Sequence, residues 1–162
     1  MYADGLAFLD EERETWRPFE ALLELSDEQL ETPVEAAHGW SGRDLMGHLA
    51  AWMGWWLEIA RELAVGPASP SFDRMRQLVA KWDEAGDQTN ERFAAEWRAL
   101  PVAEVRKRFA ELPGELRGHL TVIPETRWLK DPDHLRSLLG NTTEHYEEHA
   151  ADLRAILAAA GR

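Results

Sequence analysis

The sequence predicts an all-α protein, and three features of its 162 residues support this fold class. Alanine, leucine, glutamate and arginine, which favour helices, dominate, while the strand-favouring valine, isoleucine and threonine are scarce. Apolar residues recur every three or four positions over long stretches, without strand-like alternation of useful length. The stretches are joined by short connections, which favours an antiparallel bundle. Because no linker divides the chain, we expect a single domain over residues 1–162.

The first predicted helix runs from Asp4 to about Leu25. Pro18 lies inside it and should kink or divide it, because proline lacks an N–H group and crowds the preceding turn. Ser26, followed three residues later by glutamine, has the spacing of a capping box and predicts a short helical turn. Residues 32–39 then form a loop.

Ser41 and Asp44 mark the start of a second helix. The serine can cap free N–H groups of the first turn, and the aspartate can accept a hydrogen bond from the backbone N–H of the serine in return. This helix ends near Val65. A third helix is predicted from Phe72 to Leu100.

A fourth helix is predicted over residues 101–123, ended by a proline at the next position. Within it, Pro113–Gly114 should interrupt the helix or bend it sharply. Asp131–Pro132 is typical of a helix start and predicts a last helix that ends before Gly161. Gly140 lies inside this helix, where a break is possible.

The charge balance and the lack of cysteine exclude several kinds of protein. With 30 acidic residues against 18 Lys and Arg the net charge is −12, which opposes nucleic acid and anionic membranes as partners. The chain has no cysteine, so any metal must be held by His, Asp or Glu. We find no signal-peptide pattern at the N-terminus and no apolar run of the ~18 residues that a membrane span needs. We therefore expect a cytoplasmic protein.

Two histidines near the C-terminus, His145 and His149, are four residues apart and share one helix face, so both imidazoles can reach one metal ion. His48 faces inward on the apolar stripe of its own helix and is a plausible third ligand. Three protein ligands leave coordination positions open, as in catalytic sites. Zinc is the first expectation, with nickel, iron or manganese as other metals that suit these nitrogens.

The histidine pair does not match a metalloprotease motif, which requires glutamate directly after the first histidine, where Tyr146 stands instead. The acidic residues 147–148 that follow are expected to point away from the inward stripe. A purely structural role stays open, because each inward histidine can be an ordinary core residue satisfied by one hydrogen bond. The remaining histidines, which we interpret as ordinary loop or helix-end residues, are His38, His119 and His134.

Aromatic residues suggest an apolar pocket beside the metal. Trp52 and Trp56 flank His48 on its stripe and could form the pocket wall. Arg13 and Asn90, which lie close to otherwise apolar faces, are candidate polar residues of the same pocket. Aromatic residues at helical spacing are more often core, which is our interpretation of Trp16, Trp82 and Trp97.

Residues 39–52 (GWSGRDLMGHLAAW), 82–92 and 143–149 (TEHYEEH) together resemble the DinB/YfiT-like superfamily. Within it, the chain is similar to the branch that includes mycothiol-dependent maleylpyruvate isomerase and ClbS/DfsB-like proteins. The resemblance implies an up-down-down-up four-helix bundle with additional short helices. It also implies a divalent metal held by His48 and the later histidine pair. We expect no fused second domain like that of the isomerase, and so not its own reaction.

Three functions are compatible with this resemblance. The first is a metal-dependent S-transferase or isomerase that uses a low-molecular-weight thiol, such as mycothiol, on a small electrophile. The second is a metal-dependent hydrolase of a small toxin or ester, in a protective role. The third is a non-catalytic, stress-related binding protein or homodimer, paired through exposed aromatic residues such as Trp97 or Trp128. In all three the expected partner is a small molecule or a second copy of the chain.

Overall fold

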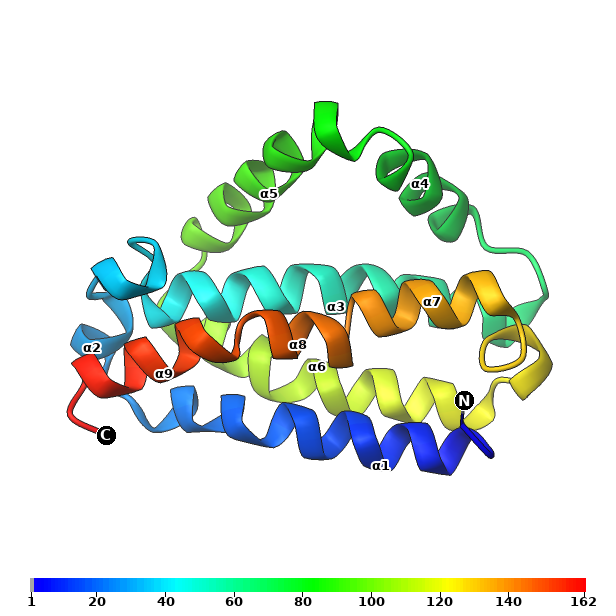
Figure 1. Ribbon diagram of the computed structural model, residues 1–162, viewed down its shortest axis with the longest axis horizontal. Helices are drawn as coiled ribbons and strands as arrows, with labels where there is room; N and C mark the ends of the chain where they lie inside the picture. The colour runs from blue at the N-terminus through cyan, green and yellow to red at the C-terminus, as the bar shows by residue number, and fades with distance from the viewer. Residues whose placement is uncertain (1) are drawn as a thin grey trace.

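A computed structural model describes residues 2–162, which contain helices and no strand. Four long helical runs lie side by side and form the body of the molecule, as Figure 1 shows. The helices of these runs are α1 (Gly5–Trp16) with its continuation η1 (Arg17–Glu24), α3 (Gly42–Val65), α6 (Val102–Val122), and the series α7 (Pro132–Gly140), α8 (Thr143–Glu148) and α9 (Ala150–Ala159). The shorter connecting elements are α2 (Asp27–Glu31), η2 (Glu35–Ala37), α4 (Pro70–Val79), α5 (Trp82–Arg98) and η3 (Glu125–Arg127).

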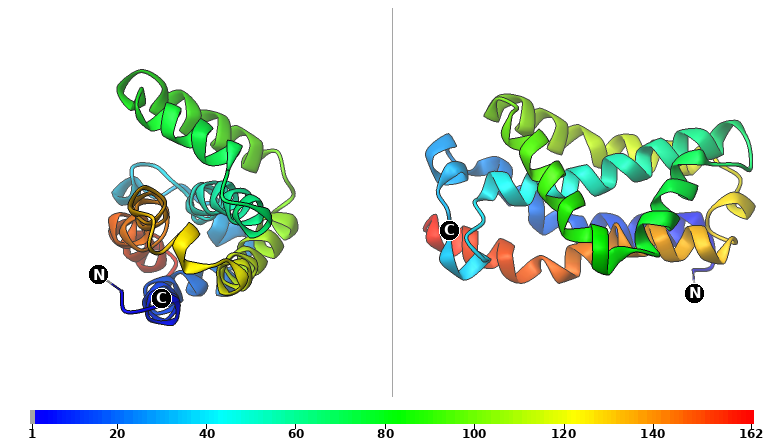
Figure 2. Two further views of the ribbon diagram at one scale, coloured as in Figure 1. Left: turned by 90° about the vertical axis from the view of Figure 1, so that its right-hand side faces the viewer. Right: turned by 90° about the horizontal axis from the view of Figure 1, so that it is seen from above.

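The order of the four runs confirms the predicted up-down-down-up bundle. In Figure 1, α1 and the α7–α9 series run in one direction, while α3 and α6 run in the other. A connection between the parallel helices α3 and α6 must return along the whole bundle, and α4 and α5 supply it. These two helices form an arch over α3, which stands clear of the bundle in Figure 1 and in the left view of Figure 2.

The predicted helix starts are confirmed by their caps. Ser26 and Ser41 each accept a hydrogen bond from the backbone N–H group three residues later, and each has the reciprocal bond of a capping box. The first helix is divided as expected, because the α-helix ends at Trp16 and a 3₁₀ segment containing Pro18 follows. Each of these boundaries depends on residues close in sequence.

Two predicted helices are broken at positions that lack a strong local signal. The single helix expected over residues 72–100 is wrong, because Ala80 and Lys81 separate α4 from α5. A straight helix of that length would be about 43 Å long, and the turn instead lets both halves return to α3. The last helix is broken after Gly140, where a break is possible from the sequence, and again at His149. Conversely, α6 continues through Pro113 without interruption.

The core is rich in aromatic residues whose polar atoms are satisfied. Trp56, which is fully buried, donates from Nε1 to the Ser137 hydroxyl at 3.1 Å. Trp128 donates to the Ile123 carbonyl at 3.3 Å and is 1% exposed. The suggestion that Trp128 pairs two copies of the chain through an exposed face is therefore wrong.

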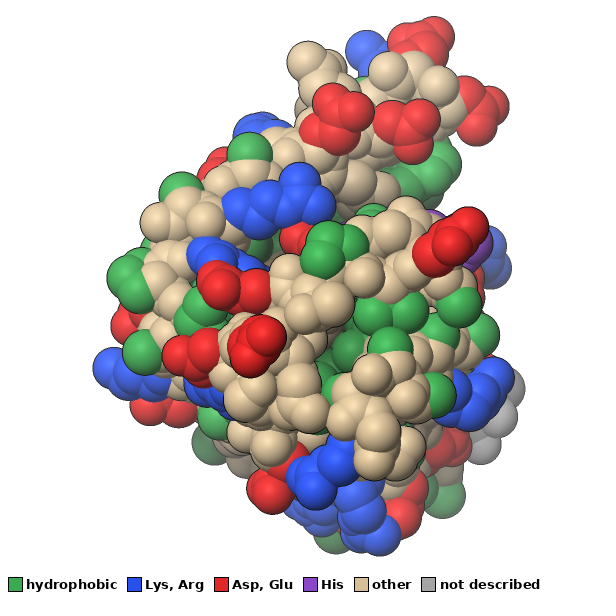
Figure 3. Space-filling view, turned by 90° about the vertical axis from the view of Figure 1, so that its left-hand side faces the viewer, with side chains coloured by type: hydrophobic (Ala, Val, Ile, Leu, Met, Phe, Trp, Pro, Cys, Tyr) green, Lys and Arg blue, Asp and Glu red, His purple; other side chains and the backbone are tan. Residues whose placement is uncertain are grey.

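Acidic and basic side chains are interspersed over the face of the molecule drawn in Figure 3. This distribution offers no concentrated cationic surface on that face, in agreement with the net charge of −12. Across the described residues, no helix combines the length and apolar character that crossing a bilayer requires.

Candidate metal centre

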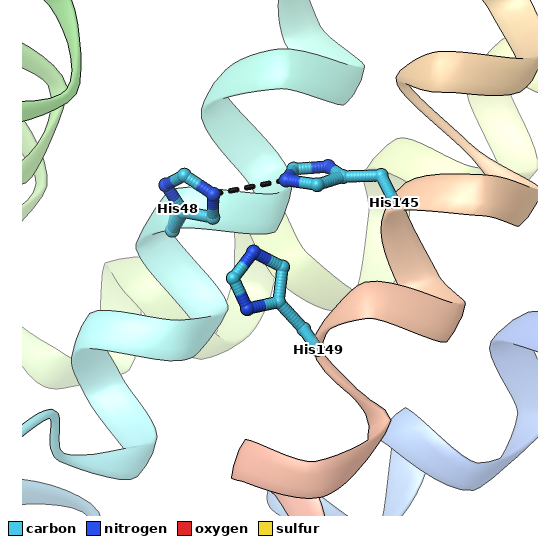
Figure 4. A group of neighbouring side chains, drawn as sticks. All are labelled: His48, His145 and His149. Carbon is cyan, nitrogen blue, oxygen red and sulfur yellow. Dashed lines mark hydrogen bonds between the residues drawn. The ribbon is translucent and has the colours of Figure 1, made fainter. Parts of the chain in front are cut away.

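Three histidine side chains converge between α3 and the C-terminal helical series (Figure 4). His48 comes from α3, His145 from α8, and His149 from the junction of α8 and α9. The Nε2 atoms of His48 and His145 are 2.9 Å apart. One possible ligand atom from each residue can be chosen so that all three lie within 4.8 Å of one another. The structure thus brings together the three histidines that the sequence predicts as ligands.

The break in the last helix gives His149 its place at the site. His149 caps α9 with φ −93° and ψ 5°, so helical geometry is interrupted at this residue. Its backbone N–H still donates to the His145 carbonyl at 3.2 Å, which keeps the two side chains one turn apart. The imidazoles of the pair lie with ring centroids 4.9 Å apart and face His48.

Burial keeps two of the imidazoles uncharged. Desolvation, followed by the proximity of His149, lowers the pKa of His48 to about 4. Desolvation, followed by the proximity of His48 and His149, lowers the pKa of His145 to about 2. Neutral imidazoles carry a free lone pair, which is the form that binds metal ions. The Nδ1 atom of His145 is buried and has no hydrogen-bond partner among residues 2–162.

Two residues that sequence reasoning missed support the third imidazole. Asp152 is 6% exposed, and its Oδ2 atom lies 2.8 Å from Nδ1 of His149. Trp40 stacks on His149 with ring centroids 5.4 Å apart, and its ring centroid is 4.9 Å from that of His48. Asp152 follows His149 by three residues, a helical spacing that could have identified it. Trp40 carried no comparable signal.

The triad opens into a cavity of about 670 Å³ between α3, the α4–α5 arch and α7–α8. This size is in the range of small-molecule sites. Aromatic and aliphatic side chains supply much of the wall, with a few polar groups among them. The cavity is lined by Trp40, His48, Trp52, Phe72, Met75, Arg76, Val79, Trp82, Asn90, Asp133, Arg136, Ser137, Gly140, Asn141, His145, Glu148 and His149.

Two of the four predicted pocket residues line this cavity. The indole Nε1 of Trp52 donates to Oδ1 of Asn90 at 3.2 Å, and both side chains contribute to the wall. Trp56 is fully buried behind the wall and does not line the cavity. Arg13 lies on the outer face of α1, with Nη1 3.5 Å from Asp10, and is absent from the lining.

One further expectation about this region is wrong. Trp82, which we interpreted as core, is 43% exposed and lines the cavity from the tip of the arch. Its ring lies against the backbone of Gly86, where only a residue without a side chain allows such close approach. Glu148, the last residue of α8, is also among the residues that line the cavity, although it is exposed to solvent.

The donor set suits a divalent transition metal. Three imidazoles from two helical runs converge without a cationic side chain among them, and the buried Asp152 carboxylate supports one of them. Such a set leaves coordination positions open, here beside the cavity. The three histidines could therefore hold a metal ion that is accessible to a small molecule.

Comparison with known proteins identifies the family of the chain. The family model described as the mycothiol maleylpyruvate isomerase N-terminal domain matches residues 12–154, which include all three histidines. No curated protein and no solved structure matches the chain. The family match extends over most of the sequence, and the predicted relation to DinB-like proteins is confirmed. The chain belongs to the mycothiol maleylpyruvate isomerase N-terminal domain family, a DinB-like family.

Proposed function

We propose that the protein is a metal-dependent enzyme that uses a low-molecular-weight thiol in an S-transfer or isomerisation reaction on a small electrophile. The observation that supports this proposal is the position of the histidine triad, at the wall of a largely apolar cavity of about 670 Å³. The family supports a mycothiol-related reaction. Since the chain has no cysteine, the thiol must be supplied by a cofactor.

In this proposal His48, His145 and His149 are the metal ligands. A divalent ion held by them would favour the thiolate form of a bound thiol at neutral pH, which is the nucleophilic form. The chain contributes two neutral imidazoles, His48 and His145, and an orienting carboxylate on the third. Asp152 holds the proton of His149 on Nδ1 and so keeps the Nε2 lone pair available.

The cavity walls would bind and orient the electrophile. Trp52 and Trp82 lie with ring centroids 5.7 Å apart and present apolar surface that can pack against its body and exclude water. The amide oxygen of Asn90 is occupied by Trp52, which leaves its amide N–H groups as donors to an oxygen of the substrate. Binding in this position would hold the reacting atom near the triad.

Metal content tests the proposal directly. The purified wild-type protein, the variants His48→Ala and His149→Ala, and the control His119→Ala are compared by elemental analysis after incubation with zinc or nickel. We expect bound metal in the wild type and the control, and its loss in the other two variants. Full metal occupancy in both His48→Ala and His149→Ala would contradict the proposed centre.

Hydrolysis of a small toxin or ester is the second candidate, and the position of Glu148 favours it. Glu148 is one of the residues that line the cavity and is next in sequence to His149, so its carboxylate would be available to accept a proton from an attacking water molecule. A panel of electrophiles, including esters and epoxides, measured with and without mycothiol, separates the two reactions. Turnover that requires the thiol supports transfer or isomerisation, whereas turnover that is indifferent to it supports hydrolysis.

A further inference from the structure

A buried polar cluster joins α8 to the opposite side of the bundle. The hydroxyl of Tyr146 donates to Oε1 of Glu12 on α1 at 3.1 Å. The other carboxylate oxygen of Glu12 accepts from Nε of Arg117 on α6 at 2.5 Å. Tyr146 is fully buried and Glu12 is 1% exposed. The three side chains, which we call the anchor cluster, therefore connect α8 with both α1 and α6.

The helix that carries His145 is not aligned by the rest of its own helical run. α8 comprises only six residues, and the chain leaves helical geometry on both sides of it, at Thr142 and at His149. A short helix between two breaks is not aligned by its neighbours along the chain. Tyr146 is the next residue after His145, and its ring packs edge-on against Trp16, with centroids 5.1 Å apart. Its hydroxyl adds a directional contact between α8 and α1.

A contribution to stability alone does not explain the anchor cluster. Burying a carboxylate and a guanidinium costs free energy that their attraction often fails to recover, and well-packed apolar residues usually serve as well. In addition, Nη2 of Arg117 is buried without a hydrogen-bond partner in the described part of the chain. Hydrogen bonds to a charged group are directional, however, and they define one position of a helix better than apolar contacts do.

We propose that Tyr146, Glu12 and Arg117 are positioning residues, which hold α8 so that the imidazole of His145 meets His48 at 2.9 Å. This inference rests on the proposed metal centre, since its purpose is to preorganise a ligand. Tyr146 acts through the helix and does not touch the site, because its hydroxyl is directed to α1.

The test is the metal affinity of Tyr146→Phe, which removes only the hydroxyl and keeps the buried ring. Residues that orient metal ligands typically change affinity 10- to 100-fold, and for this more remote group we expect zinc or nickel binding to weaken about ten-fold. The chain offers a control in Thr121, whose hydroxyl donates to the Gly118 carbonyl at 2.6 Å on the exposed side of α6. Thr121→Val, which removes only this hydroxyl function, should bind metal as the wild type does.

A merely structural role predicts a different result. It would lower the melting temperature of Tyr146→Phe but leave the dissociation constant, measured well below that temperature, unchanged, and this outcome overturns the proposal. Hydrogen exchange of the metal-free protein supplies a second readout. Amides of residues 143–148 should exchange faster in Tyr146→Phe than in Thr121→Val, and equal rates would also overturn it. Failure of the wild type itself to bind metal would instead contradict the proposed function, while the exchange result still tests the anchor cluster.

Discussion

The carboxylate of Asp152 lies 2.8 Å from Nδ1 of His149, and this contact determines which nitrogen of the imidazole faces the triad. An ionised carboxylate only accepts hydrogen bonds, so the proton resides on Nδ1 and Nε2 keeps its lone pair. Carboxylates in this position also raise the basicity of a ligating histidine. Asp152 thus leaves Nε2 of His149, a histidine at a helix break, free to face the triad as a possible ligand atom.

Asp152→Asn should weaken metal binding by about 10- to 100-fold, because the amide is a poorer acceptor and can also donate to Nδ1, which favours the wrong tautomer. The measurement is a competition titration with a chromophoric chelator. His38→Ala provides the control, since His38 lies 3.7 Å from the other oxygen of Asp152 and its side chain is 85% exposed. An unchanged affinity in Asp152→Asn would show that this carboxylate does not orient His149.

The capping box of α3 predicts a pH-dependent contribution to stability. Desolvation acts to raise the pKa of Asp44, but hydrogen bonds from Arg98 and Ser41 outweigh it and hold the pKa below its ordinary value. A carboxyl whose pKa is depressed by folding stabilises the protein above its unfolded-state pKa, and this contribution is lost as the pH falls through the folded-state pKa. Asp44→Asn should therefore cost about 1 kcal/mol at neutral pH.

The difference between wild type and Asp44→Asn should shrink as the pH falls below about 4, where the wild-type carboxyl also becomes neutral in the unfolded chain. Denaturant unfolding at several pH values measures this. The control Asp10→Asn removes a carboxylate that is 78% exposed and contacts Arg13 at 3.5 Å, so it should change stability little. A deficit in Asp44→Asn that is constant with pH would contradict the assigned role.

Helix starts can be predicted because their signals are local. Ser26 with Gln29, and Ser41 with Asp44, satisfy the first N–H groups of their own helices within four residues. The break at Ala80–Lys81 has no such signal, because it depends on how α4 and α5 return to α3. Similarly, Pro113 stays inside α6, where packing of this buried residue outweighs its local tendency to end a helix.

The candidate site likewise has parts that can be predicted from local sequence and parts that cannot. Helical spacing alone places His145 and His149 on one face, and the apolar stripe places His48 inward. The cavity, by contrast, is formed by the arch, whose position is a tertiary property, so helical spacing wrongly assigns Trp82 to the core. Arg13 is polar beside an apolar face, which makes it a pocket candidate by sequence, but it lies at the surface instead.

The contact between Trp82 and Gly86 predicts different outcomes for two glycine substitutions. A Cβ atom added at Gly86 would lie 2.6 Å from Cε2 of Trp82, so Gly86→Ala must displace the ring. At Gly54, in the middle of α3, no atom lies within 4 Å of an added Cβ. Gly54→Ala should therefore stabilise the protein by the usual helical difference of about 0.5–1 kcal/mol, and Gly86→Ala should lose most or all of this gain.

Thermal unfolding of the two glycine variants measures the difference, since about 1 kcal/mol shifts the melting temperature of a protein of this size by roughly 2–4 °C. An equal increase in both variants would mean that Trp82 moves away from Gly86 without cost. The cavity wall at this position would then be easily deformed, and ligand binding would depend little on the position of Trp82.

Metal binding should itself stabilise the fold, because the ligands come from α3 and from the C-terminal series and meet only in the folded chain. At a free metal concentration of about 100 times the dissociation constant, the gain is about 2.7 kcal/mol. With roughly 2–4 °C per kcal/mol, the melting temperature should rise by about 5–10 °C and fall again on addition of a chelator. His48→Ala should show no rise, whereas His119→Ala should respond as the wild type does. An equal rise in His48→Ala would place the bound metal elsewhere, because a site that lacks one of three imidazoles cannot retain the full binding free energy.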